Sequence, residues 1–167
     1  MNNILTARAA EAMIERYCDG VHDVNHFLKV HSYARMIGIL EGLDEDVLLT
    51  LELAAIVHDI ACPLCRRLYG RADGDKQELE GPALARELLS GLGCDAPRTE
   101  RVCALVGRHH TYTNVDGPDA RILLEADFLV NADEGHASEA AMREMLGGVF
   151  RTETGARLLR RISGLKG

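Results

Sequence analysis

The chain has 167 residues, of which 47% are hydrophobic and 27% are charged, and its formal net charge is −7. This balance is typical of one soluble globular domain and excludes a disordered chain, while the negative charge argues against stable binding to nucleic acid. No apolar run approaches the length of a bilayer span and no signal peptide is visible, so we expect a cytoplasmic protein with no membrane partner.

Hydrophobic periodicity is helical along nearly the whole chain, and no alternating segment of useful length indicates a strand. The predicted helices cover residues 5–18, 24–41, 44–60, 62–70, 77–90, 97–109, 119–133, 137–147 and 152–163, and residues 71–76 form a surface loop that could be a lid. We predict an all-α, compact helical bundle with a single domain over residues 1–167. Its functional core spans about 22–133, and packing helices follow at about 135–163.

The third predicted helix carries an ionisable pair, His58 and Asp59, at the end of the apolar run that starts at Leu53. Burying such a pair is costly unless a partner compensates it, and a bound cation does so economically. The cysteines near this pair, Cys62 and Cys65, form a lone CxxC motif. Because five scattered cysteines do not resemble a disulfide framework, we expect both thiols to be reduced and structural, or to shape the pocket beside Asp59.

Geometry selects His26 as the partner of this pair. A short turn near Leu43 makes the second and third helices an antiparallel hairpin, and His26 and His58 lie 17 and 15 residues from it. At about 1.5 Å per residue they lie within roughly 3 Å of the same height. His26 also shares an inward stripe with Val30, whereas Asp23 has the position of a helix cap. The alternative for His26 is a core histidine bonded to a carbonyl.

Asp127 lies in the middle of an apolar helix, where capping cannot explain an aspartate. We therefore expect it to be the fourth ligand, with neighbouring Glu125 facing solvent. Two imidazoles and two carboxylates suit a divalent Mn, Fe, Co, Ni or Mg ion better than structural zinc, which prefers thiolates.

The order His26, His58-Asp59, Asp127 resembles the H…HD…D signature of the HD domain superfamily of metal-dependent phosphohydrolases, as found in its small bacterial single-domain members. The resemblance spans residues 26–127. It implies a helical bundle with a divalent metal at its centre and hydrolysis of a phosphate ester or nucleotide. One departure is Ala61, where the family commonly has glycine, so we expect an unusual pocket wall.

Catalytic residues are predicted around this metal. Asp59 would help to activate the bound water, and His109 or His110 would donate a proton to the leaving group or hold a phosphate. Adjacent helical side chains project about 100° apart, so we expect only one of these two histidines, His109, to face the metal. Both could also be structural.

A second metal ion is a further possibility, since some members of the superfamily hold two. No histidine lies between His58 and His109, but Glu80 has roughly the position of the missing ligand. Glu80 with His109 or His110 could complete a second site. Alternatively, Glu80 only complements the dipole at the start of a helix.

The sequence thus predicts a metal-dependent phosphohydrolase acting on a nucleotide or another small phosphorylated metabolite, as a monomer or homodimer. The alternatives are a di-iron oxygenase on the same scaffold and a non-catalytic metal or nucleotide sensor. Candidate phosphate-binding residues are Lys29, Arg66, Arg67, Lys76 and Arg108.

Overall fold

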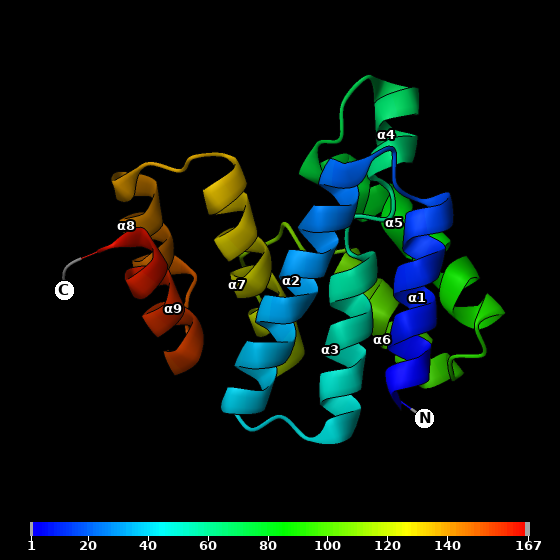
Figure 1. Ribbon diagram of the computed structural model, residues 1–167, viewed down its shortest axis with the longest axis horizontal. Helices are drawn as coiled ribbons and strands as arrows, with labels where there is room; N and C mark the ends of the chain where they lie inside the picture. Colours follow the sequence, from blue (N-terminus) through cyan, green and yellow to red (C-terminus); the bar gives the residue numbers. More distant parts are fainter. Residues whose placement is uncertain (1, 166–167) are drawn as a thin grey trace.

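The computed structural model describes residues 2–165, and within this range the chain forms helices and no strand, which confirms the all-α prediction (Figure 1). The helices are α1 (Asn2–Arg16), α2 (Val21–Leu40), α3 (Glu45–Val57), α4 (Cys62–Tyr69), α5 (Gly74–Gly91), α6 (Ala96–Val106), α7 (Gly117–Glu134), α8 (Glu139–Gly148) and α9 (Glu153–Ser163).

Helices α2 and α3 form the predicted antiparallel hairpin (Figure 1). Gly42 closes α2 with φ +77°, a left-handed conformation that glycine adopts without steric cost. Asp44 is the N-cap of α3, because its Oδ1 accepts hydrogen bonds from the backbone N–H groups of Asp46 (3.1 Å) and Val47 (2.9 Å). These two devices fix the register in which the two helices face each other.

Several predicted helix ends are three residues off, among them the start of α2 and the ends of α3 and α6. Helix α3 ends at Val57 rather than near residue 60, and a hydrogen-bonded turn leads from it into α4. Residues 71–76 are not all loop, since α5 begins at Gly74 and the backbone N–H groups of Lys76 and Gln77 both donate to the carbonyl of Asp73 at 3.0 Å. Asp73 has the extended backbone of an N-cap residue. The polar residues around it are typical of loops, so the sequence does not indicate that a helix begins here.

Helix α3 occupies the centre of the bundle, where it packs against α1, α2, α6 and α7. Every residue from Leu49 to Val57 is buried, including the polar Thr50 and Glu52, because this part of α3 is covered by other helices on all sides. Contrary to the sequence-based expectation, the stretch Glu45–Tyr69 is long and apolar enough to cross a membrane by length and composition. However, 78% of its most apolar window is buried inside the protein, as in the core helix of a globular domain.

Glu125 does not face solvent, as we expected from the sequence, but is fully buried. Its carboxylate accepts hydrogen bonds from the backbone N–H groups of Arg151 (2.7 Å) and Thr152 (3.0 Å) and from the Thr152 hydroxyl. Thr152 is in turn the N-cap of α9. Glu125 therefore ties the last helix to α7, a long-range contact that the local sequence around Glu125 does not reveal.

Candidate metal centre

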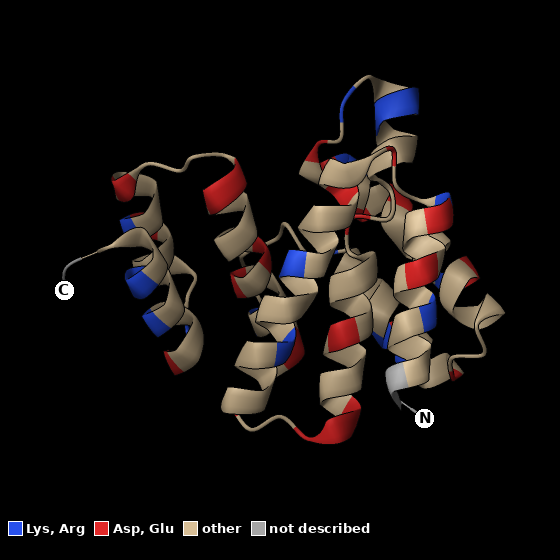
Figure 2. Ribbon diagram, in the orientation of Figure 1, with Lys and Arg blue, Asp and Glu red and all other residues tan. Residues whose placement is uncertain are grey.

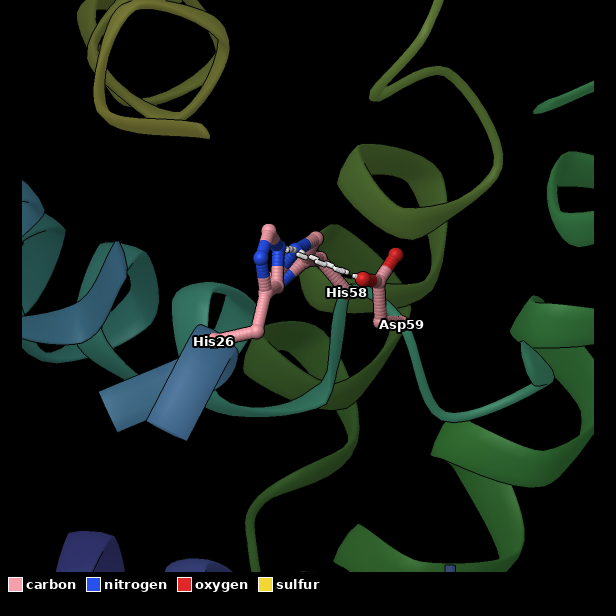
Figure 3. A group of neighbouring side chains, drawn as sticks. All are labelled: His26, His58 and Asp59. Atoms are coloured by element: carbon pink, nitrogen blue, oxygen red, sulfur yellow. Dashed lines mark hydrogen bonds and ion pairs between the residues drawn. The ribbon is translucent and has the colours of Figure 1, made fainter. Parts of the chain in front are cut away.

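The structure brings His26, His58, Asp59 and Asp127 together from three parts of the chain. His26 projects from α2, His58 and Asp59 follow the end of α3, and Asp127 lies in α7. His26 Nε2 lies 3.2 Å from His58 Nε2, 3.2 Å from Asp127 Oδ1 and 3.3 Å from Asp59 Oδ2. His58 Nε2 is 3.4 Å from each of the same two carboxylate oxygens. Figure 3 shows the two rings meeting beside the Asp59 carboxylate.

These separations match the spacing of donors around one cation. Metal bonds of about 2.1 Å place adjacent donors about 3.0 Å apart in octahedral geometry and about 3.4 Å apart in tetrahedral geometry. The observed separations of 3.2–3.4 Å lie within that interval. His26, His58 and Asp59 lie close enough together to hold one ion. Asp127 Oδ1 lies beside both imidazoles, so the four side chains form a candidate donor set for one divalent ion.

Hydrogen bonding on the far side of each ring supports this interpretation. His58 Nδ1 donates to the Ala55 carbonyl at 2.9 Å, and His26 Nδ1 donates to Glu134 Oε2 at 2.8 Å. With the ring proton on Nδ1, a neutral imidazole has only a lone pair on Nε2. Two such lone pairs face each other and two carboxylates, an arrangement that is repulsive until a cation lies between them.

The pKa values of the clustered residues also support a cation site. Burial alone would raise the pKa of Asp59 and of Asp127, but the surrounding imidazoles hold both far below their usual range. Burial alone would lower the pKa of His26, yet Asp127, Asp59 and Glu134 raise it to about 9. Both aspartates are therefore ionised at neutral pH, and in the absence of a metal a proton on His26 is the substitute cation.

Two residues of α7 that the sequence analysis did not select support the ligands. Asn131 Nδ2 donates to Asp127 Oδ1 at 2.9 Å, and Glu134 holds His26 from behind while its other oxygen accepts from Lys29 Nζ at 3.1 Å. Asp127, Asn131 and Glu134 follow one another at i, i+4 and i+7, which places them on one face of α7. That spacing is the sequence signal that could have identified them.

His109 and His110 both approach Asp59, whereas we expected only one of them to do so. His109 Nε2 lies 3.4 Å from Asp59 Oδ1, and His110 also places a ring nitrogen within 4.8 Å of donor atoms of both residues. Both Nε2 atoms are shielded from solvent and have no hydrogen-bond partner among residues 2–165. Both histidines lie in the turn after α6. The His110 ring packs against Gly74 so closely that a Cβ atom at position 74 would lie 2.8 Å from His110 Cγ. These three residues form a second group that could hold an ion.

The structure does not bring Glu80 to this second group. Glu80 instead accepts a 2.6 Å hydrogen bond from the Tyr69 hydroxyl. The carboxylate that reaches this region is Glu78, whose Oε1 accepts from His110 N and from Thr111 Oγ1, both at 2.9 Å. The position of Glu80 in the sequence was thus misleading, since a helix turns its side chains by about 100° per residue and Glu78 faces the histidines instead.

A cavity of about 190 Å³ opens beside the metal centre, and its walls include His26, Asp59, Cys62, Gln77 and Glu134. Cys62 is buried and its thiol pKa is raised by that burial, so it shapes the wall as an inert group. All five cysteines are free, as we expected.

The candidate phosphate-binding residues are distributed unevenly around this cavity. Arg66 lines it, and its guanidinium binds Asp23 Oδ1 at 2.6 Å and Asp19 Oδ2 at 3.0 Å. Asp23 was expected to cap α2, but it accepts from Arg66 and from the backbone N–H of Asp19.

The other candidates have different partners. Lys29 pairs with Glu134, Arg67 lies 3.9 Å from Asp19, and Lys76 lies 3.2 Å from Asp75. Arg108 donates to the carbonyl of Thr113 and lines a separate cavity of about 170 Å³.

Comparison with known proteins agrees with this geometry. The family model of the HD domain matches residues 23–138. A crystal structure of a predicted HD superfamily hydrolase from an uncultured Thermotogales bacterium superimposes with a TM-score of 0.65, at 25% sequence identity over 97% of this chain and 84% of that chain. No curated protein shows a significant match to this sequence. Because the family model covers more than half of the chain and includes every residue of the donor set, this protein belongs to the HD domain family.

Proposed function

We propose that this protein is a divalent-metal-dependent phosphohydrolase that acts on a nucleotide or another small phosphorylated metabolite. The observation that carries the proposal is the convergence of four side chains, in which the Nε2 atoms of His26 and His58 lie 3.2–3.4 Å from carboxylate oxygens of Asp59 and Asp127. The likeness to a protein described as an HD superfamily hydrolase supports the hydrolytic part. The ion would be Mn, Fe, Co, Ni or Mg, which accept mixed nitrogen and oxygen ligands.

When bound, a divalent ion lowers the pKa of a coordinated water and neutralises charge on a phosphoryl group. The four donors would hold it and leave positions for water and a substrate oxygen. Asp59 and Asp127 supply two negative charges that balance the ion. Glu134 and Asn131 keep His26 and Asp127 in the required orientation.

His109 and His110 provide polar atoms on the other side of Asp59. Val106 fixes the His109 ring by accepting its Nδ1–H at 2.7 Å, which leaves Nε2 directed at Asp59. With one ion bound, this nitrogen is placed to hold a proton for the leaving oxygen. With two ions bound, His109 and His110 would be ligands with Asp59.

The test is phosphate release by chelator-treated protein reloaded with each of the five ions in turn. We expect activity with at least one ion and none in the His58→Ala/Asp59→Ala double variant. Asp46→Asn removes an exposed carboxylate that binds Arg98 at the far end of α3, and it should behave as wild type. A metal-loaded protein that releases no phosphate from a broad ester panel would contradict the proposal.

The second group favours one alternative function, a di-iron oxygenase on the same scaffold, because Asp59, His109 and His110 could hold a second ion. Metal analysis separates the two functions. Two irons per chain with a mixed-valent electron paramagnetic resonance signal would support the oxygenase, and one redox-inert ion per active chain would exclude it.

A further inference from the structure

The charges around the cavity at the metal centre are already paired. Arg66, the arginine in its wall, is bound by Asp19 and Asp23, and the nearby Lys29 is bound by Glu134 with Asp133 at 3.9 Å. Four carboxylates therefore surround two cations, in addition to the two aspartates that a divalent ion would balance. Figure 2 shows that acidic and basic residues both occur at the end of the bundle where α4 lies. Among the described residues, the arginine in the wall and the neighbouring lysine are both paired, so neither is free to bind a phosphate that does not contact the metal.

The wall also offers hydrogen-bond acceptors to a ligand. Gln77 Nε2 donates to the Ala72 carbonyl at 2.8 Å, which fixes the orientation of the amide and identifies the other atom as oxygen. That oxygen, Oε1, is buried and has no hydrogen-bond partner among residues 2–165, and the Gln77 residue is only 6% exposed. Burying an acceptor without a partner is unfavourable, and a donor group of a ligand would satisfy it. Asp23 and Glu134 add carboxylate oxygens to the same wall.

The size of the cavity limits its ligand. Its volume of about 190 Å³ is below the roughly 300–1,000 Å³ of pockets that enclose drug-sized molecules. A compact molecule with one phosphate on the metal and a short carbon skeleton against the wall fits this volume better than an extended one.

On this basis we propose that the cavity selects small monophosphate esters of polyhydroxy or amino alcohols and discriminates against substrates with a second phosphate. The proposal rests on the function proposed above and narrows its substrate class. Hydroxyl or ammonium groups of the alcohol would donate to Gln77, Asp23 and Glu134. A second phosphate would be repelled by the carboxylates of the wall, and Arg66 is already bound to Asp19 and Asp23.

Four probes test the two parts of this proposal. Glycerol phosphate and propyl phosphate differ only in hydroxyl donors, and a hexose 6-phosphate differs from the hexose 1,6-bisphosphate only in the second phosphate. We expect kcat/KM to be at least tenfold higher for glycerol phosphate than for propyl phosphate, and at least tenfold higher for the monophosphate than for the bisphosphate. Equal values within either pair, or the reverse order, would overturn the proposal.

Two variants connect these preferences to named residues. Gln77→Leu should reduce the ratio of glycerol phosphate to propyl phosphate at least threefold. Asp23→Asn removes one negative charge and loosens the hold on Arg66, so hydrolysis of the bisphosphate should rise at least threefold relative to the monophosphate. Asp46→Asn is the matched control, because it also removes a carboxylate from an arginine pair but does so far from the cavity. Unchanged ratios in both cavity variants would contradict the assignment.

Binding and hydrolysis are measured separately, so that the proposed function and the proposed substrate class can be tested independently. Isothermal titration of the metal-loaded protein with the same four probes measures selection by the cavity whether or not turnover occurs. Hydrolysis of 4-nitrophenyl phosphate tests the phosphohydrolase activity alone. Turnover of this reporter with no preference among the probes would refute only the substrate class, and the expected order of binding without turnover would refute only the hydrolase.

Discussion

His26 Nδ1 and Glu134 Oε2 lie 2.8 Å apart, although 108 residues separate them in the chain. The bond joins α2 to the last residue of α7 and fixes the ring so that Nε2 faces the other three donors. His58 and His109 are held differently, since each donates to a backbone carbonyl three residues earlier. His26 is thus the member of this trio whose orientation depends on a side chain.

We predict that Glu134→Ala weakens metal binding by about 10–100-fold, the usual cost of losing a partner that orients a metal-bound histidine. Glu134→Gln, which retains an acceptor for the Nδ1–H but loses the charge, should lie between this variant and wild type. Isothermal titration of the apoprotein with Mn²⁺ measures the effect. Wild-type affinity in Glu134→Ala would show that His26 does not need this support.

Metal binding should also stabilise the folded protein. An ion at a hundred times its dissociation constant adds about 2.7 kcal/mol to the free energy of unfolding. For a chain of this length each kcal/mol raises Tm by roughly 2–4 °C, so we expect an increase of about 5–10 °C on adding metal to chelator-treated protein. Differential scanning calorimetry checks this value. His58→Ala should abolish the increase, and a full increase in that variant would contradict the assigned ligands.

The sequence was sufficient to predict the parts of the fold that depend on local pattern. Helical periodicity and the short turn near Leu43 predicted the hairpin, and the hairpin predicted that His26 lies at the height of His58. The His58-Asp59 pair was conspicuous because apolar residues surround it in the chain itself. These signals are local or follow from one short turn, so they needed no knowledge of how the helices pack.

The errors about carboxylates concern residues whose partners lie far away in the sequence. Glu125 was assigned to solvent because its partners, Arg151 and Thr152, belong to a segment whose packing no local pattern reveals. Glu80 was expected near the histidines, where Glu78 lies instead, because sequence position does not give the rotation of α5 against α6. In both cases the rotation and packing of the helices decided which partners the carboxylate contacts.

The buried Glu125 leads to a prediction about stability. Glu125→Ala leaves the N–H groups of Arg151 and Thr152 without their acceptor, and we expect a loss of roughly 2–4 kcal/mol in the free energy of unfolding. Urea denaturation measures it. Glu139→Ala is the control, since Glu139 forms an exposed pair with Arg143 and its loss should cost only about 0.5 kcal/mol. Equal losses in the two variants would mean that Glu125 does not stabilise the junction with α9.

Glu52 of α3 binds His31 Nε2 at 3.0 Å and Arg35 Nη1 at 2.8 Å. Burial alone would raise the pKa of Glu52, but these two partners on α2 hold it below its usual value. A lowered carboxyl pKa means that the folded state binds this proton less readily than the unfolded state. The stabilisation is therefore complete above the ordinary glutamate pKa of about 4.3 and is lost as the pH falls through the lower folded value.

Urea denaturation of wild type and Glu52→Gln between pH 7 and pH 3 measures this contribution, and using chelator-treated protein keeps metal release out of the comparison. We expect wild type to be the more stable protein at pH 7 and the difference to shrink as the pH falls below about 4.3. A difference that stays constant down to pH 3 would show that the Glu52 charge does not stabilise the contact between α2 and α3.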